Sequence, residues 1–198
     1  MASPLLAPAR ANLLERAASC YEQAGLPAEA ARCYADAGAH LRAATLYDRL
    51  DMAAEAAAAY RDGGLLEQAA WTLVDRLGDT TGARAVLPHV TTARTEAQRL
   101  SIELVLARCH LAEDGGGRLV PATLRRAADL LANRSVRVEL RLEEWAVAVA
   151  IAAHRFDQVA LIFAAAIRGR RPRARERWQA WSERQFGAPV PLAWLEER

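Results

Sequence analysis

Lysine is absent from this chain of 198 residues, and its 26 basic residues are all arginines. Without a lysine amine the chain cannot form a Schiff base, and it cannot build the phosphate loop that depends on a lysine. No His-Glu-x-x-His, Cys-x-x-Cys or Gly-x-Ser-x-Gly sequence occurs either. Acid–base catalysis needs carboxylates in a cleft, whereas Glu143 and Glu144 are expected on a solvated helix surface. We therefore expect no enzymatic activity and no cofactor.

Cysteines are few and long hydrophobic runs are missing. The three cysteines are an odd number in segments with helical patterns, which does not suggest a disulfide framework. The longest apolar run, from Trp145 to Ala153, has nine residues, whereas roughly 20 are needed to cross a bilayer. Residues 1–10 contain no basic leader followed by a long apolar segment. We expect a cytoplasmic protein that does not contact a membrane.

Only one cysteine has a histidine beside it, at Cys109-His110. Zinc needs about four converging ligands, and adjacent side chains on a helix point about 100° apart. We therefore expect no metal site, with Cys109 in the core and His110 at the surface. Cys20 and Cys33 occupy equivalent positions of a repeat described below and are expected to be small buried side chains.

Alanine dominates the composition, with 46 of the 198 residues. Hydrophobic residues make up 53% and aromatic residues 6%, and 24 acidic residues leave a formal net charge of +2. These values exclude a disordered tail protein and argue against a globally basic nucleic-acid binder.

A pattern of thirteen residues repeats through the first half of the chain. Alanine pairs begin at Ala17, Ala30, Ala43, Ala56 and Ala69. The chain's four tyrosines each follow the first alanine of a pair by four residues, at Tyr21, Tyr34, Tyr47 and Tyr60. Four residues further on come Gly25, Gly38, Asp51 and Gly64. Ala-Ala-x-x-Tyr lies on one face of a helix, and a glycine after a helix favours the left-handed conformation that ends it. The pattern predicts one helix of about nine or ten residues per repeat, followed by a three-residue turn.

Helices of this length are unstable alone in water. Consecutive helices are therefore expected to pack antiparallel and to build a right-handed solenoid. The tyrosines would supply the large packing side chain of each repeat. Alternatively, some of their hydroxyl groups would line the concave face and contact a peptide, since aromatic residues are favoured in binding hot spots.

Three repeats carry a family resemblance: Ala-Ala-Ser-Cys-Tyr-Glu-Gln-Ala-Gly (17–25), Ala-Ala-Arg-Cys-Tyr-Ala-Asp-Ala-Gly (30–38) and Ala-Ala-Thr-Leu-Tyr-Asp-Arg-Leu-Asp (43–51). They resemble the tetratricopeptide-like superfamily, specifically the short-helix repeats of SNAP-type adaptors, over roughly residues 11–90. The resemblance implies an all-α fold of antiparallel helical hairpins. Two helices take 26 residues here, against about 34 in the standard unit, so none of the family's peptide-binding residues is assigned.

After Pro88 the period is lost and the helices are expected to lengthen. We expect a helix capped by Thr95 and ending near 113, then helices over 121–133, 135–154, 156–168 and 172–187. With the repeats, this gives about eleven helices and no strand. The expected organisation is an extension (1–10), a short-helix region (11–90) and a longer-helix region (91–198), in which Trp194 and Leu195 fold back as a C-terminal cap.

The second half also resembles tetratricopeptide hairpins, through residues 146–166. The segment from Trp145 to Trp181 is similar to helical companion proteins associated with ATPases of bacterial multi-gene conflict systems. That similarity implies a subunit of a multi-component bacterial system.

The strongest local charge signal is a set of six arginines within ten residues, Arg168, Arg170, Arg171, Arg173, Arg175 and Arg177. Only Glu176 offsets them, and Trp178 and Trp181 follow directly. Arginine pairs with phosphate and carboxylate groups and stacks on aromatic rings. Three interpretations stay open: a solvated surface, a site for an acidic protein partner, or a nucleic-acid patch.

We expect a non-catalytic protein–protein interaction scaffold or adaptor. It would hold a segment of another protein with the tyrosine repeats and with the arginine cluster. The alternative is a nucleic-acid-associated regulator that acts through Arg168 to Arg177.

Overall fold

A computed structural model describes residues 6–114 and 118–191 of the chain. Within these ranges it contains eleven α-helices, one short 3₁₀ helix and no strand, which confirms the all-α prediction. The chain divides into two compact units, Met1–Pro88 and His89–Arg198, and each is described by itself. The expected cap by Trp194 and Leu195 lies outside the described residues.

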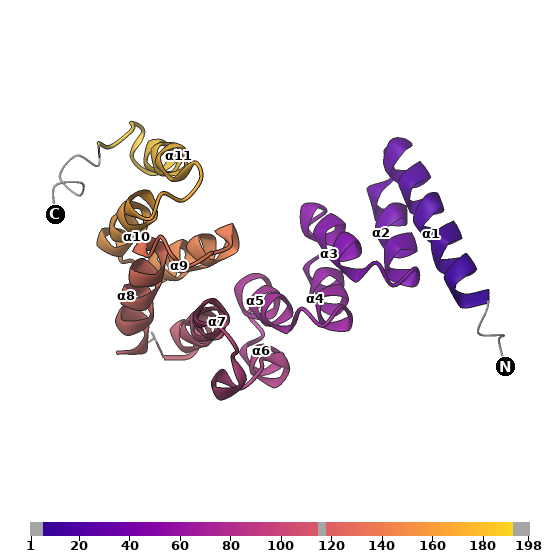
Figure 1. Cartoon of the computed structure of the whole chain (residues 1–198), viewed down its shortest axis with the longest axis horizontal. Helices are drawn as coiled ribbons and strands as arrows, with labels where there is room; N and C mark the ends of the chain where they lie inside the picture. Colours follow the sequence, from indigo (N-terminus) through magenta and orange to yellow (C-terminus); the bar gives the residue numbers. More distant parts are fainter. Residues whose placement is uncertain (1–5, 115–117, 192–198) are drawn as a thin grey trace. The chain divides into compact units, whose positions relative to one another are not determined.

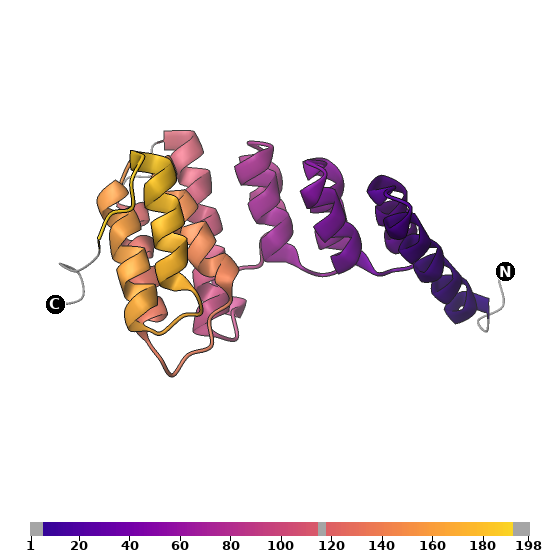
Figure 2. The ribbon, with the colours of Figure 1, turned by 90° about the horizontal axis from the view of Figure 1, so that it is seen from above.

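The first unit consists of helices that each pack on their neighbours in sequence (Figures 1 and 2). They are α1 (Leu6–Gln23), α2 (Pro27–Asp36), α3 (His40–Arg49), α4 (Ala53–Asp62), α5 (Leu66–Arg76) and α6 (Thr80–Val86). From α2 to α4 every helix has ten residues and the connections have three, as the repeat predicts. Pro27 opens α2, where the missing N–H costs no intrahelical hydrogen bond.

In the second unit, longer helices pack around a core of branched side chains. They are α7 (Glu96–Asp114), α8 (Leu119–Ala132), α9 (Leu140–Ala152), α10 (Phe156–Arg168) and α11 (Ala174–Phe186), after a 3₁₀ helix (Val90–Thr92). Helices α7, α8 and α9 contact one another, α10 packs on α8 and α9, and α11 packs on α10. Fully buried side chains include Ile102, Leu104, Leu124, Leu131 and Ile162.

The starts of three helices in the second unit differ from expectation. Helix α8 begins two residues before Pro121, α9 begins at Leu140 instead of near Ser135, and α11 begins at Ala174 instead of at Pro172. The backbone carbonyl of Val136 accepts a hydrogen bond from an arginine side chain, so residues before α9 serve a connection between elements. Thr95 does cap α7 as predicted, because its Oγ1 accepts a hydrogen bond from the Gln98 N–H at 3.1 Å.

The four turns that connect α1 to α5 share one backbone geometry. Gly25, Gly38 and Gly64 have φ of +73°, +80° and +73°, and Asp51, at the glycine position of its repeat, has φ of +62°. In each turn the next residue donates its N–H to the carbonyl of the repeat tyrosine, for example Ala39 to Tyr34 at 2.8 Å. This is the Schellman geometry, which satisfies carbonyls at a helix end. Each thirteen-residue repeat in this part of the sequence therefore ends in a turn with one left-handed residue.

Small side chains form the core of the first unit. Alanines from α1 to α4 pack with Leu46, Tyr34 and Tyr47 in one buried cluster. Alanine is the strongest helix former and lets neighbouring helices approach closely. Cys33 is half-buried against this cluster. The expectation that Cys20 is buried is wrong, because it lies at an exposed position of α1.

Within residues 6–114 and 118–191, no helix combines the length and the apolar character needed to span a bilayer.

Substitutions of Gly38 test whether the repeat requires a left-handed residue in its turn. A methyl group on Gly38 would meet nothing within 4 Å, so Gly38→Ala acts through the backbone alone. We expect it to lower the free energy of unfolding by about 1–2 kcal/mol, measured by urea denaturation. Gly38→Asn should lose less, because asparagine tolerates this conformation. Equal stability of Gly38→Ala and the wild type would contradict the turn geometry.

Candidate functional site

The four repeat tyrosines differ in exposure. Tyr34 and Tyr47 are buried, at 2% and 7% exposed, and Tyr60 is partly buried against the same core cluster. Tyr21, in the terminal helix, is 38% exposed. Burial favours the packing interpretation for the inner tyrosines, since their rings are enclosed by neighbouring helices. Only Tyr21 presents a substantial aromatic surface to solvent.

Two tyrosine hydroxyl groups bind acidic residues of the preceding helix. Tyr34 Oη donates to Glu22 Oε2 at 2.8 Å, and Tyr60 Oη donates to Asp48 Oδ2 at 2.6 Å. Each acceptor lies twelve residues earlier, directly after the preceding repeat tyrosine. At the corresponding position for Tyr47 the chain has Ala35. The bonds therefore tie α1 to α2 and α3 to α4, and the acidic residue after alternate tyrosines is the signal that the sequence analysis missed.

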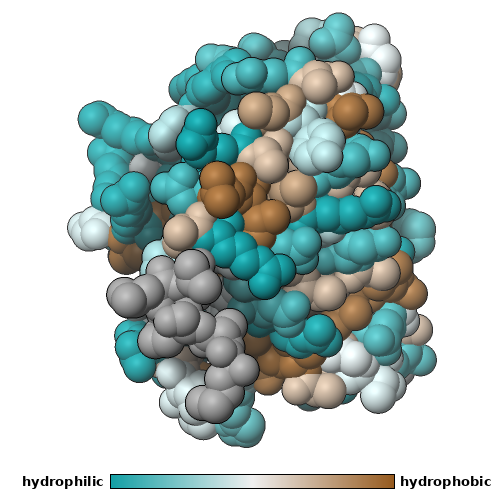
Figure 3. Space-filling view, turned by 90° about the vertical axis from the view of Figure 1, so that its right-hand side faces the viewer, coloured by the Kyte–Doolittle hydropathy of each residue, from teal (hydrophilic) through white to brown (hydrophobic). Residues whose placement is uncertain are grey.

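Hydrophobic surface does not single out a binding face on the side shown in Figure 3. Hydrophobic residues appear there in separate groups among hydrophilic ones. Charge is more informative. Residues 1–88 carry 8 arginines and 11 acidic residues, whereas residues 89–198 carry 18 arginines and 13 acidic residues. The basic excess therefore belongs to the second unit.

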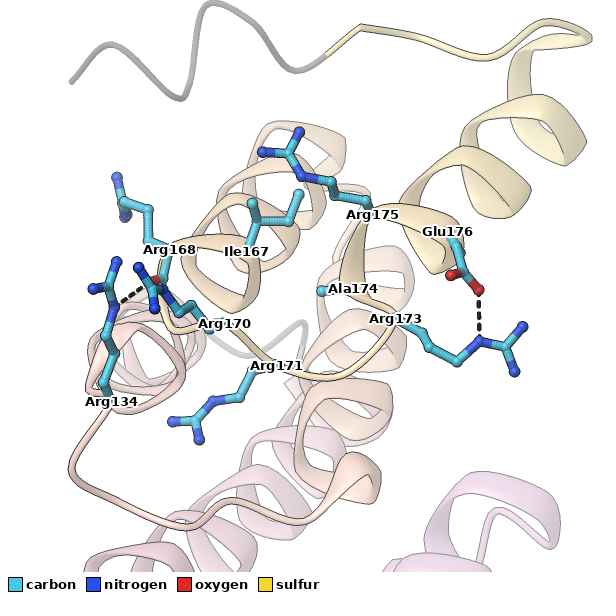
Figure 4. Close-up of a pocket in the computed structure, with 9 residues that line it drawn as sticks. All are labelled: Arg134, Ile167, Arg168, Arg170, Arg171, Arg173, Ala174, Arg175 and Glu176. Atoms are coloured by element: carbon cyan, nitrogen blue, oxygen red, sulfur yellow. Dashed lines mark hydrogen bonds and ion pairs between the residues drawn. The ribbon is translucent and has the colours of Figure 1, made fainter.

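An open pocket of about 590 Å³ lies in the second unit where α10 leads into α11 (Figure 4). We call it the arginine pocket. Its lining residues are Arg134, Ile167, Arg168, Arg170, Arg171, Arg173, Ala174, Arg175 and Glu176. Five of the six arginines singled out from the sequence line it, and Arg134 joins them from the loop after α8. The lining therefore contains six arginines and one acidic residue, Glu176.

The backbone after α10 repeats the turn of the first unit with an arginine in the glycine position. Arg170 has φ of +56°. Its N–H donates to the Ile167 carbonyl at 3.0 Å, and the Arg171 N–H donates to the Ala166 carbonyl at 2.9 Å. Arg173, directly before α11, is left-handed as well, with φ of +55°. Two non-glycine residues in this unfavourable region line a single pocket, and such residues concentrate at functional sites.

Gly169 lets the end of α10 approach the end of α8 closely. It is buried, and a Cβ atom there would overlap the carbonyl oxygen of Leu131. Its own φ of −72° is an ordinary value, so packing rather than backbone conformation requires glycine. This contact brings the loop that carries Arg134 next to α10, where Arg134 Nε donates to the carbonyl oxygen of Arg168 at 2.9 Å.

Arg171 is a structural residue. Its guanidinium group donates to four backbone carbonyls around the end of α8, at 2.8–3.0 Å, those of Leu130, Leu131, Asn133 and Val136. Carbonyls at a helix C-terminus have no intrahelical donor, and the helix dipole is negative there. Arg171 therefore caps α8 and holds the loop before α9, which leaves it little capacity for a ligand.

Arg177 is structural too, and it corrects the expectation for Glu143. Glu143 is 2% exposed, and Arg177 binds both of its carboxylate oxygens, Nε to Oε1 at 2.7 Å and Nη2 to Oε2 at 2.6 Å. A buried carboxylate needs such a partner because desolvation is costly. The pair joins α9 to α11. Trp178 and Trp181 are buried and stack on each other, so the first turns of α11 are fixed against the core.

Arg168, Arg170 and Arg173 have more freedom than these structural arginines. Arg173 pairs with Glu176 but its side chain is 80% exposed. Arg168 and Arg170 are exposed, and no residue of the described ranges hydrogen-bonds or pairs with their guanidinium groups. Among the residues that the structure describes, no side chain caps the N-terminus of α11, whose first residues line the pocket. The positive end of that helix adds to a field that favours an anion.

The described groups with a shifted pKa lie outside the pocket. Burial raises the pKa of Tyr47, which keeps the phenol protonated. Hydrogen bonds from the Arg155 side chain and from Gln158 lower the pKa of Asp157 well below its usual range. Asp157 lies in the first turn of α10, at the end opposite the pocket. Within the part of the chain that the structure describes, no three His, Cys, Asp or Glu side chains are grouped as a metal site requires.

Comparison with known proteins adds no constraint: the chain matches no family model, no curated protein and no solved structure.

The division of roles among the arginines can be tested by stability. Arg171→Gln removes charged hydrogen bonds to helix-end carbonyls, and we expect it to lower the free energy of unfolding by about 2–3 kcal/mol. Arg170→Gln removes the same charge from an exposed, unpaired side chain and should change stability by less than about 0.5 kcal/mol. Urea denaturation of both variants measures the difference. Equal losses would refute the assignment.

Proposed function

We propose that this protein is a non-catalytic, cytoplasmic adaptor that binds another protein through its second unit. Its first unit would be a tetratricopeptide-like right-handed solenoid of short helical hairpins, a class of architecture that suits protein binding. Three features support this architecture: the thirteen-residue period, the packing of each helix on its sequence neighbours, and the repeated left-handed turns. A role beside an ATPase of a bacterial multi-component system extends the proposal through the similarity of residues 145–181.

The arginine pocket carries the proposal for where the partner binds. Its lining contains six arginines and one acidic residue, and the side chains of Arg168 and Arg170 have no partner in the described ranges. Guanidinium groups bind carboxylates and phosphates through paired N–H donors. The partner segment is therefore expected to be acidic. The buried tyrosines play a supporting role in this scheme, because they set the packing of the first unit.

The side-chain contacts weaken the nucleic-acid alternative, because some arginines of the cluster are already bound to other groups. Arg171 is committed to backbone carbonyls and Arg177 to Glu143. A duplex is bound along its phosphate backbone by several cations at once. The arginines that remain surround a pocket instead of following an extended surface. An acidic peptide fits this arrangement better than a duplex.

Binding of a short fluorescent glutamate-rich peptide tests the proposed function. We expect the full chain to bind it with micromolar affinity that weakens as salt rises, because the contact is a partly exposed charge interaction. Replacing both Arg168 and Arg170 with alanine should weaken binding by about tenfold, which corresponds to about 1.4 kcal/mol. Fluorescence anisotropy measures each affinity.

Two matched variants separate the pocket from general charge and from folding. Arg10→Ala with Arg16→Ala removes the same charge from exposed positions of α1 and should leave binding unchanged. Arg170→Gly removes the guanidinium group but suits the left-handed backbone, so it should weaken binding without lowering the unfolding midpoint. Equal losses in the α1 variant, or tighter binding of duplex DNA than of the peptide, would refute the proposal.

A further inference from the structure

We infer that the arginine pocket recognises a phosphorylated side chain within the acidic segment. This inference rests on the proposed function and names the chemical group that the same pocket takes. A phosphoserine or phosphothreonine carries a charge of about −1.5 to −2 and three acceptor oxygens at neutral pH. The charge of the pocket and the arrangement of its arginines both favour that group over a single carboxylate.

The charge of the lining exceeds what one carboxylate can balance. Six arginines and one glutamate line the pocket, and that glutamate, Glu176, is already paired with Arg173. Arg171 spends its donors on carbonyls, yet its positive charge remains. Like charges held close together repel each other, and the attraction of each charge to an anion between them offsets that repulsion. A dianion relieves this repulsion more fully than a monoanion does.

Arg134, Arg168 and Arg170 lie at one edge of the pocket that they help to line (Figure 4). Arg134 is held there because its Nε donates to the Arg168 carbonyl, which leaves its terminal amino groups available. Arg168 and Arg170 retain all their side-chain donors within the described ranges. A carboxylate offers two coplanar oxygens, which one guanidinium fork can occupy. A tetrahedral phosphoryl group offers three oxygens in different directions, so three forks can bind it together.

The pocket is large enough to take a modified side chain together with part of the neighbouring peptide. Its volume of about 590 Å³ lies within the range of ~300–1,000 Å³ found for sites that enclose small ligands. Ile167 and Ala174 supply apolar surface beside the arginines, which suits the aliphatic part of the modified residue and its neighbours. The left-handed backbone at Arg170 and Arg173 turns the α10–α11 connection around this space.

Three peptides of one sequence test the inference with the full chain. They carry serine, glutamate or phosphoserine at a single position within an otherwise identical acidic segment. We expect the phosphoserine peptide to bind about tenfold more tightly than the glutamate peptide, and the serine peptide to bind most weakly. Arg168→Gln and Arg170→Gln should each remove most of this preference, whereas Arg10→Gln in α1 should leave it intact.

The outcomes separate this inference from the proposed function. Equal affinity for the phosphoserine and glutamate peptides would overturn the phosphoryl inference while the acidic-segment function stands. Failure of all three peptides to bind would overturn both. Tighter binding of a single-stranded oligonucleotide than of the phosphopeptide would assign the pocket to nucleic acid and overturn both as well. Arg170→Gly, which suits the left-handed backbone, should also lose the preference while its unfolding midpoint stays at the wild-type value, so that lost binding is not mistaken for lost folding.

Discussion

A ten-residue helix cannot hold itself together in water, and this constraint governs the first unit. Each helix from α2 to α4 gains its stability by packing on the helices before and after it. Alanine makes the close approach possible, and the tyrosines fill the space that alanine leaves. The turns must then be short and identical. The left-handed residue every thirteen positions meets that requirement, because it ends one helix and places an apolar residue at the start of the next.

The same turn chemistry recurs at the end of α10 with a different consequence. In the first unit the left-handed position is glycine three times and Asp51 once, which are residues that tolerate it well. After α10 the position is Arg170, a long side chain in a conformation that costs free energy. The cost is borne because α10 and α8 are locked together at Gly169 and Arg171. A rigid connection of this kind can hold an unfavourable residue in a fixed direction.

Much of the fold could be predicted from the sequence, because its signals are local. The period predicts the helix lengths and turns of α2 to α4, including the left-handed backbone at Asp51. For the site, the sequence predicts a cluster of arginines but not the role of each one. Arg171 and Arg168 look alike in the sequence, but the acceptors of Arg171 lie 35–41 residues away. The partner of Arg177, Glu143, lies 34 residues away and belongs to a pair expected on the surface. Roles that depend on such distant contacts become visible only in the folded chain.

The distinction between structural and available arginines explains how so many positive charges fit on one short connection. Carbonyls at the ends of α8 and α10 are negative and lack donors of their own. Arg171 and Arg134 satisfy them, and Arg177 neutralises a buried carboxylate. Only a guanidinium group offers donors in enough directions to bind four carbonyls at once, as Arg171 does. Arg171 and Arg134 support the backbone from which Arg168 and Arg170 extend, and they contribute positive charge while their own donors bind carbonyls. Two unpaired guanidinium groups in that field form a site that is preorganised for an anion. The free energy of folding already offsets the repulsion between them, so this cost is not added when a ligand binds.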